Sequence, residues 1–311
     1  GVAKVLPVQS LAPSNNKLLL VTATQPGPCT THRGDYMLQL STKNKWQYAA
    51  LHGYRVWLST ELLSPWDLSG QWNKVALLSV LMDSDSAAAG GAEWLLWMDD
   101  DAIFCDMHFS FPLESYEAAG VNLVMWGDET MTYEQGNSEG INTGIMLIRR
   151  CDWSRALLSE LTMVASSALR ATLTNHDQGG LVHLLRTQPE RWRRHTLLER
   201  NFTMNGHWPE YAGRFVLGQP RLSSPVWGSS AIPVIVHYSG CQMCRGHSFN
   251  GTWTEAGISA CQRAFMEAFV FADDLALRQQ LGMRHTRLGT MGVRPAQNSP
   301  LQRRHELLTR C

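Results

Sequence analysis

Strand-length apolar runs alternate with helical patterns along the first third of the chain. The runs cover residues 18–24, 54–58 and 93–98, and Gly, Pro or polar residues bound each of them. Between them, apolar residues recur at helical spacing over 35–53 and 71–82, with Asp35 as a candidate cap and Gly53 as a candidate stop for the first helix. This alternation predicts a parallel sheet covered by crossover helices.

The pattern in the rest of the chain is more mixed. Strands are predicted over 121–126, 145–148 and 233–238, and helices over 153–169, 177–185 and 258–281, with Asp152 as a candidate cap for the first of these helices. The segment 142–144 lies between two strands and is interpreted as a turn. The predicted fold class is therefore α/β, with one mixed, mostly parallel sheet and flanking helices.

The domain organisation follows from the absence of any repeat or low-complexity linker in the sequence. We expect a single catalytic domain over 1–283, followed by a basic, loosely ordered tail over 284–311. That tail holds six Arg and one Glu, so it carries +5 with His neutral, and the rest of the chain carries the compensating charge.

Composition narrows the function classes. The 27 basic and 27 acidic side chains balance, which argues against electrostatic binding of nucleic acid. Hydrophobic residues make up 44% and charged residues 17%, so general disorder is excluded. Twelve Trp residues suggest a carbohydrate ligand, because an indole ring suits a sugar face, although it suits cores and interfaces equally. Sequons at Asn201 and Asn250 matter only in the secretory pathway.

The seven Cys residues are an odd number and too sparse for a disulfide framework. One or two disulfides are compatible with this count, and in an oxidising compartment Cys241 or Cys244 can pair with Cys261. The alternative is a zinc site, because His237, Cys241, Cys244 and His247 have compatible spacing.

An acidic triplet is the strongest chemical signal in the sequence. Asp99, Asp100 and Asp101 directly follow the buried run 93–98, and functional groups of open α/β sheets gather at such strand ends. Adjacent carboxylates repel unless a cation compensates them, and their oxygens suit Mg²⁺ or Mn²⁺ bridging a diphosphate. A plain turn is the alternative. The similar pair Asp83 and Asp85 follows a helix and is interpreted as a solvated helix end.

Other candidate residues have both a structural and a functional interpretation. His237 ends a strand, as a buried His or a metal ligand does. Asp177 opens a helix, where a carboxylate favours the positive end, or it serves a ligand. Lys74 can neutralise a phosphate or lie in solvent, and Asn142 can form a turn or contact a ligand. Trp208 is a candidate sugar platform, whereas the Trp residues of 93–98 are expected to pack the strand.

Taken together, these segments resemble glycosyltransferase family 34, which comprises plant xyloglucan xylosyltransferases, galactomannan galactosyltransferases and fungal Golgi mannosyltransferases. The resemblance extends from about residue 18 to residue 281. It includes the strings Glu93-Trp-Leu-Leu-Trp-Met-Asp-Asp-Asp-Ala102 and His237-Tyr-Ser-Gly-Cys-Gln-Met-Cys244. The remaining shared blocks are residues 20–29, 34–36, 43–45, 51–53, 72–74, 142–144, 149–153, 177–178, 261 and 268–273.

The resemblance implies a GT-A fold, a UDP-sugar donor, a Mn²⁺ ion with Mg²⁺ as the substitute, and retaining α-1,6 transfer of xylose or galactose to a glycan. It also implies a Golgi-lumenal enzyme whose membrane anchor lies outside this chain, with a homodimer as one expectation. The positions that match imply the following roles: metal ligands Asp99, Asp101 and His237; donor binding by Thr22, Thr24, Gln25, Lys74, Asp99, Asp100 and Gly240; catalysis by Asp177 and Gln178; acceptor binding by Asn142, His176 and Trp208.

The chain departs from the family pattern at three places. His176 and Gln242 replace an Asp and a Lys that the family often has, with Arg245 as a candidate substitute for the Lys, and Asn205-Gly-His-Trp208 replaces the usual His-Gly-Phe-Trp. Two rival functions are a non-catalytic carbohydrate-binding protein, favoured by the Trp content, and a metal-dependent phosphohydrolase. The phosphohydrolase would need a Ser or Thr close to Asp101, which the following Ala-Ile-Phe does not supply.

Overall fold

The computed structural model describes residues 17–65, 67–83, 91–215, 233–241, 243–244 and 254–273. The chain divides into two compact units, Gly1–Asp273 and Asp274–Cys311, and all the described residues belong to the first. The predicted tail over 284–311 and the end of the helix predicted over 258–281 lie outside the described residues. No helix among the described residues is long and apolar enough to cross a membrane.

The main sheet has six strands in the order β2-β1-β3-β6-β5-β7, and every strand except β6 runs in the same direction. This mixed, mostly parallel sheet confirms the predicted fold class. The strands are β1 (Leu18–Ala23), β2 (Arg55–Ser59), β3 (Trp94–Met98), β5 (Leu123–Gly127), β6 (Ile141–Arg149) and β7 (Thr196–Leu198). Every side chain of the central strand β3 is buried, as its unbroken apolar run predicts for a strand covered on both faces.

A second sheet of three short strands has the order β4-β9-β8, formed by β4 (Ala102–Phe104), β8 (Gly206–His207) and β9 (Ile235–His237). Strand β4 is antiparallel to β9, and Ala102 pairs with His237 in their register. Because β4 starts directly after the acidic triplet, this pairing brings His237 beside that triplet.

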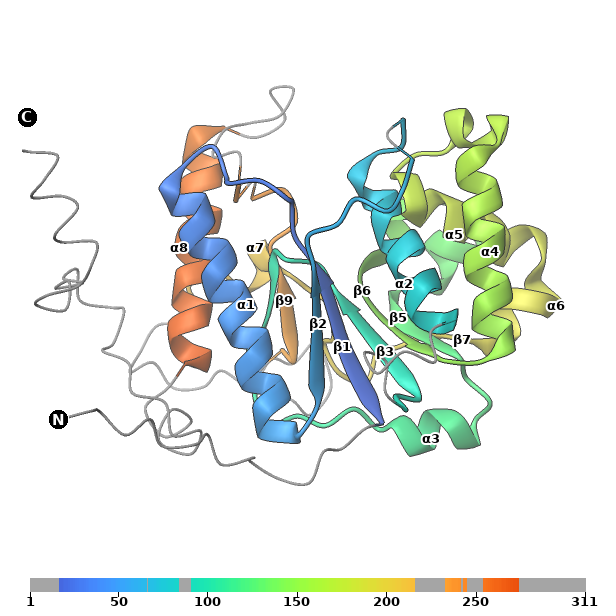
Figure 1. Ribbon diagram of the computed structural model, residues 1–311, viewed down its shortest axis with the longest axis horizontal. Helices are drawn as coiled ribbons and strands as arrows, with labels where there is room; N and C mark the ends of the chain where they lie inside the picture. The colour runs from blue at the N-terminus through green and yellow to red at the C-terminus, as the bar shows by residue number, and fades with distance from the viewer. Residues whose placement is uncertain are drawn as a thin grey trace, which may run out of the picture. The chain divides into compact units, whose positions relative to one another are not determined.

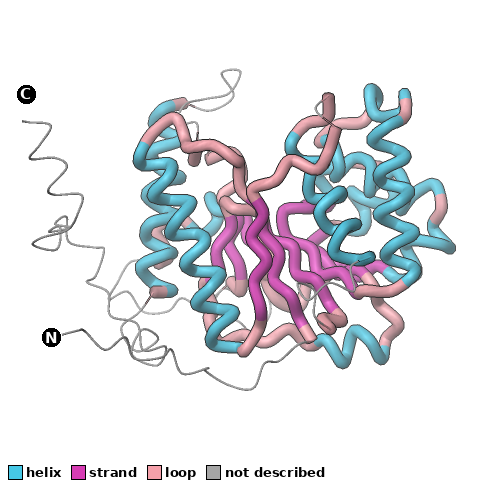
Figure 2. Tube along the Cα trace, in the orientation of Figure 1, coloured by secondary structure: helices cyan, strands magenta, loops and turns pink. Residues whose placement is uncertain are grey.

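Helices lie on both sides of the main sheet. Figure 1 shows α1 (His32–His52) beside α8 (Glu255–Ala272) at one side, and α2 (Asn73–Asp83), α4 (Asp152–Ser166) and α5 (His176–Thr187) at the other. Figure 2 shows the strands between these two groups. The short helices are α3 (Leu113–Ala118), α6 (Pro189–Trp192) and α7 (Trp208–Tyr211). Single turns of 3₁₀ helix cover Gly70–Trp72, Ser138–Gly140, Ala168–Thr172 and Arg193–His195, and a π-helical turn covers Thr130–Gln135.

The ends of α1 confirm one half of the sequence prediction and correct the other. Gly53 ends the helix in the left-handed region at φ 69°, as predicted. The cap at the start is Thr31, whose side chain accepts a hydrogen bond from the Gly34 N–H, and not Asp35. Asp35 instead accepts from the Cys29 N–H at 2.7 Å, so it stabilises the loop before the helix.

The start of α4 and the start of β6 also differ from the prediction. Asp152 is the first residue of α4, and Cys151 holds the cap position. The segment 142–144, predicted to be a turn, belongs to strand β6. Its polar side chains belong to the site described below, so the segment lacks the apolar pattern that identifies the rest of the strand.

Candidate active site

Asp99, Asp101 and His237 meet at the edge of the main sheet where β3 ends. The His237 Nε2 lies 3.0 Å from Asp101 Oδ1 and 3.9 Å from Asp99 Oδ2. One ligand atom from each of the three residues lies within 4.8 Å of the other two. We call this group the acidic triad. It brings together three residues that lie up to 138 positions apart and that the family resemblance assigned to one metal ion.

The donor set of the acidic triad suits a divalent cation. Carboxylate oxygens and an imidazole nitrogen are ligands of Mn²⁺ and, with more oxygens, of Mg²⁺. Gly144 leaves room for the imidazole ring, because a Cβ at this position would lie 2.8 Å from His237 Nδ1. The residues present therefore fit the metal that the resemblance implies, while the identity of the ion rests on the family alone.

Burial and mutual repulsion shift the charges of these groups. Burial and the two flanking carboxylates raise the pKa of Asp100 to about 7, and burial also raises the pKa of Asp99. Burial opposes ionisation of Asp101, but His237 outweighs it and holds the pKa of that carboxyl below its usual range. Burial likewise disfavours the imidazolium of His237, yet Asp101 and Asp99 hold its pKa above the ordinary value.

Two buried lysines compensate this negative charge from opposite sides. The Lys45 Nζ donates to Ser41 Oγ at 2.6 Å and to the Ala102 carbonyl at 2.7 Å, and burial lowers the pKa of Lys45 to about 8. The Lys74 Nζ lies 3.4 Å from a carboxylate oxygen of Asp99 and 3.4 Å from one of Asp177. The ammonium group of Lys74, which was expected to meet a phosphate, lies between two carboxylates, and the residue also lines the cavity described next.

A cavity of about 540 Å³ opens on one side of the acidic triad and gathers most of the residues expected to bind the donor. The loops after β1, β2 and β3 and the turn after β9 form its wall. Among the expected residues, those lining it are Thr24, Gln25, Lys74, Asp99, Asp100, Asp101 and Gly240. Thr22 is 2% exposed within β1 and lies outside this lining, so its assignment to donor binding stays a prediction. We call this space the donor-side cavity.

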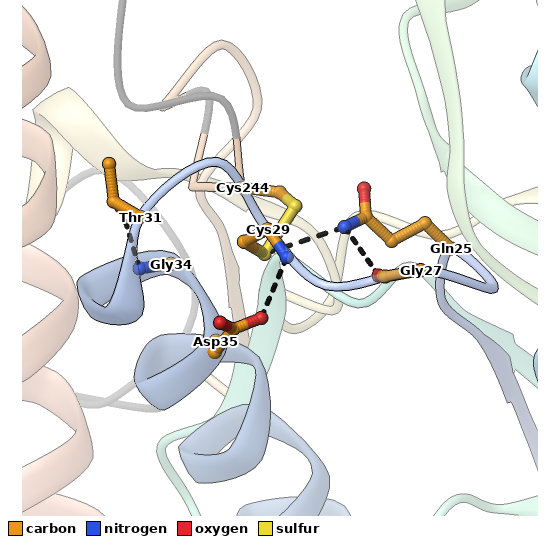
Figure 3. Close-up of a disulfide and its surroundings, with 7 residues drawn as sticks. All are labelled: Gln25, Gly27, Cys29, Thr31, Gly34, Asp35 and Cys244. Atoms are coloured by element: carbon orange, nitrogen blue, oxygen red, sulfur yellow. Dashed lines mark hydrogen bonds between the residues drawn. A yellow bond between two sulfur atoms is a disulfide. The ribbon is translucent and has the colours of Figure 1, made fainter. Parts of the chain in front are cut away.

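A disulfide between Cys29 and Cys244 joins two edges of the donor-side cavity (Figure 3). It connects the loop after β1 to the turn after β9, and the Thr30 N–H donates to the Cys244 carbonyl beside it. Gly34 packs directly under this junction, where a Cβ would lie 2.9 Å from the Cys29 Cβ. Figure 3 also shows the Gln25 side chain folded back toward Gly27, to whose carbonyl its amide donates at 2.9 Å.

A second disulfide pairs Cys241 with Cys261 and fixes the same turn to α8. It is one of the pairings that the sequence left open. The zinc alternative is wrong, because Cys241 and Cys244 are both oxidised; His247 lies outside the described residues, as do Gln242 and Arg245. Cys105 and Cys151 are the free cysteines within the described part of the chain.

A second cavity, of about 480 Å³, opens on the other side of the acidic triad, and His237 lines it. We call it the acceptor-side cavity. Its wall combines aromatic rings with polar groups, the combination typical of sugar sites. The lining residues used below are Trp126, Asn142, Gln178, Phe202, Asn205 and Tyr211. The Gln178 amide is fixed in this wall, because its Oε1 accepts from the Thr143 N–H at 3.2 Å and its Nε2 donates to the Ser138 carbonyl at 2.6 Å.

Three residues expected at the site lie elsewhere. Trp208 is 6% exposed and packs inside the fold on α7, so Trp126, Phe202 and Tyr211 supply the aromatic surface instead. His176 is exposed and lines neither cavity, and its backbone φ of 52° follows from the turn that starts α5. Asp177 is 3% exposed, faces Lys74 and lines neither of the two cavities.

Sequence reasoning missed several residues that this geometry makes central. Asn205 was noticed only as a departure from the family pattern, and Lys45 only as part of a shared block. Neither carries a local signal, since their partners are distant in the sequence. Cys29 lies in the loop after the first strand, and that position was the one available hint of its role.

A mostly parallel α/β sheet, an Asp-x-Asp strand end joined to a distant His, and a cavity on each side of them define the chain as a GT-A-type glycosyltransferase fold. Residues 14–248 match the galactosyl transferase GMA12/MNN10 family. The chain belongs to this family, which is glycosyltransferase family 34, and the resemblance drawn from the sequence is confirmed.

Two relatives and one solved structure show what the chain is similar to. It is 33% identical over 303 residues to xyloglucan 6-xylosyltransferase 1 of Arabidopsis thaliana, covering 93% of this chain and 63% of the relative. It is 34% identical to probable glycosyltransferase 3 of Oryza sativa subsp. japonica, covering 91% of this chain and 61% of the relative. The chain thus spans less than two thirds of the length of these relatives.

The solved structure is a glycosyltransferase involved in the glycosylation of the major capsid of PBCV-1. It matches with a TM-score of 0.50 and 12% identity, covering 80% of this chain and 98% of that one. This likeness supports the fold alone.

Proposed function

We propose that the protein transfers xylose or galactose from a UDP-sugar to a glycan acceptor, with retention of configuration, an α-1,6 linkage and a divalent cation, Mn²⁺ in the first place. The position of the acidic triad between two cavities carries this proposal. A nucleotide diphosphate in the donor-side cavity and an acceptor hydroxyl in the acceptor-side cavity would meet at this group.

The cation would be held by Asp99, Asp101 and His237, and it would supply stabilisation of the negative charge that grows on the departing diphosphate. The protein side chains do the rest of the positioning. Lys74 keeps Asp99 in place through the ion pair at 3.4 Å, and the Trp97 Nε1 donates to the same carboxylate at 2.7 Å. Two contacts of fixed geometry leave Asp99 little freedom to rotate away, which favours a preorganised site.

Gln178 is the side chain best placed to face the reacting sugar. Its amide is held by Thr143 and Ser138, and its oxygen can stabilise positive charge that develops on the sugar ring. The acceptor hydroxyl then attacks from the face that the diphosphate leaves, and a phosphate oxygen takes its proton.

A double displacement through Asp177 is disfavoured by its surroundings. Its carboxylate is buried, paired with Lys74, and packed beside the apolar side chains of Leu161 and Leu181. A nucleophile must reach the anomeric carbon, and a group that lines neither ligand cavity does not. We therefore interpret Asp177 as the buried carboxylate that holds the Lys74 ammonium group in place.

The compartment proposed is the Golgi lumen, with a membrane anchor outside this chain. Two disulfides within the described residues favour an oxidising compartment, and the family resemblance points to the Golgi. The single domain over 1–283, the basic tail and a homodimer stay predictions.

The test is a panel of UDP-xylose, UDP-galactose, UDP-glucose and GDP-mannose, each with a β-glucan oligosaccharide, in Mn²⁺ and in EDTA. We expect Mn²⁺-dependent transfer from UDP-xylose or UDP-galactose, and a product linkage read by NMR. Binding of the glycan without transfer from any donor would favour a carbohydrate-binding protein. Hydrolysis of a phosphate ester without sugar transfer would favour a phosphohydrolase, and either result would refute the proposal.

A further inference from the structure

Two asparagine side chains hold His237 on the side away from the acidic triad. The His237 Nδ1 lies 3.1 Å from Asn142 Oδ1 and 3.2 Å from Asn205 Oδ1. Both partners are carbonyl oxygens, which only accept hydrogen bonds, so Nδ1 must carry the hydrogen. The remaining ring nitrogen, Nε2, then faces Asp101 and Asp99.

Backbone groups fix the orientation of both amides. The Gly144 N–H donates to Asn142 Oδ1 at 2.9 Å, so this atom must be the oxygen. The Asn205 Nδ2 donates to the Asn142 backbone carbonyl at 3.3 Å and to Asn142 Oδ1 at 2.8 Å, so this atom must be the nitrogen. Because a backbone N–H can only donate and a backbone carbonyl can only accept, neither amide can be turned around without losing these hydrogen bonds.

The three residues come from three segments that this arrangement ties together. Asn142 lies on β6, His237 ends β9, and Asn205 directly precedes β8, which pairs with β9. Asn205 and His237 are 7% and 5% exposed, and Gly144 leaves the space that the ring occupies. The His237 ring is buried, its Nδ1 donates a hydrogen bond, and Gly144 packs closely against it. These contacts leave the ring a single orientation.

We propose that Asn142 and Asn205 are positioning residues that set the tautomer and direction of His237, so that Nε2 is presented to a divalent cation. This inference rests on the cation site within the proposed function, but it does not require sugar transfer to occur. Hydrogen-bond partners of this kind typically change metal affinity by about 10–100-fold when they are removed.

The test is Mn²⁺ binding to the metal-stripped protein, measured by the EPR signal of free Mn²⁺ at fixed neutral pH. Asn205→Leu keeps the branched shape of the side chain and removes its hydrogen bonds, and we expect the Kd for Mn²⁺ to rise about 10–100-fold. The matched control is Asn122→Leu, since Asn122 precedes β5 at the opposite edge of the sheet.

Thermal unfolding without metal separates positioning from general damage, because Asn205→Leu should bind Mn²⁺ weakly while it still unfolds cooperatively. Native Mn²⁺ affinity in folded Asn205→Leu would overturn the inference. If that variant fails to fold, imidazole nitrogen NMR of the native protein loaded with diamagnetic Cd²⁺ decides, since coordination through Nδ1 contradicts the proposed tautomer. Absence of Mn²⁺ binding to the native protein would instead refute the cation site of the proposed function.

Discussion

Removing the Cys29–Cys244 disulfide should weaken both the fold and the donor-side cavity. The two residues are separated by 215 positions, and the loop-entropy relation converts that separation into about 5 kcal/mol of stabilisation. Cys241 and Cys261 are separated by 20 positions, which gives about 3 kcal/mol. The variant Cys29→Ser/Cys244→Ser should therefore lose more free energy of unfolding than Cys241→Ser/Cys261→Ser.

Loss of the disulfide should also weaken UDP binding, because few contacts then hold the two segments of the cavity wall together. Gln25 and Cys244 both line the donor-side cavity, and the hydrogen bond from the Thr30 N–H to the Cys244 carbonyl is a backbone contact that remains between their two segments. One such bond contributes about 1 kcal/mol, less than the cost of ordering a loop residue or two. We expect the Kd for UDP to rise about tenfold, which corresponds to about 1.4 kcal/mol.

Urea unfolding and calorimetric titration with UDP measure the two effects separately. Cys151→Ala, which removes a half-buried free thiol that makes no capping hydrogen bond, should change neither quantity. If Cys29→Ser/Cys244→Ser binds UDP as the native protein does, the disulfide does not shape the donor-side cavity. If Cys29→Ser/Cys244→Ser loses less free energy of unfolding than Cys241→Ser/Cys261→Ser, the loop-entropy argument is wrong.

Four further outcomes are expected. Asp101→Asn should abolish Mn²⁺ binding and transfer while circular dichroism stays native; turnover at the native rate would contradict the acidic triad. Lys74→Met leaves Asp177 buried without its cation and should cost about 3–5 kcal/mol in urea unfolding, much of which Lys74→Met/Asp177→Leu should recover. Burial lowers the pKa of His52, so the unfolded state takes up protons first, and Tm should fall as pH drops below about 6.5. His52→Gln should give a flatter profile of Tm against pH, and an unchanged slope would exclude His52 as the cause. Trp126→Ala should raise the acceptor KM about 5–10-fold, since an aromatic contact contributes roughly 1–1.5 kcal/mol, with the donor KM unchanged; a change in the donor KM instead would place Trp126 on the wrong side.

The four central strands of the sheet could be predicted from the sequence because nearly all their side chains are buried, whereas the short edge strand β7 was not predicted. The run 94–98 has no polar interruption, which is typical of a strand covered on both faces. The start of β6 could not be predicted in the same way. Asn142 and Gly144 serve His237, so their side chains follow the needs of the site and break the strand pattern.

The acidic triad was predictable in its residues but not in its geometry. Asp99 and Asp101 were identified as candidate metal ligands because they follow a predicted strand. His237 was assigned to the same metal ion only through the family resemblance. The pairing of Ala102 with His237 is the physical reason for that link, and strand pairing over such a separation leaves no local trace. Trp208 shows the converse, because residue type suggests a sugar platform and only the packing of α7 shows that the ring is buried.

The reversal of β6 has a consequence for how this protein can diversify. Because β6 runs against its neighbours, its first residues, and not its last, reach the edge where β1 and β3 end. The donor-side wall is built from residue 38 and from segments around 23–26, 61–62, 70–74, 97–101, 240 and 243–244. The acceptor-side wall is built from residues 126 and 178 and from segments around 139–142, 200–211 and 237–239. These sets share no residue. Mutations can therefore accumulate in one wall while the other keeps its sequence, so the acceptor-side cavity can change without substitutions in the donor-side wall.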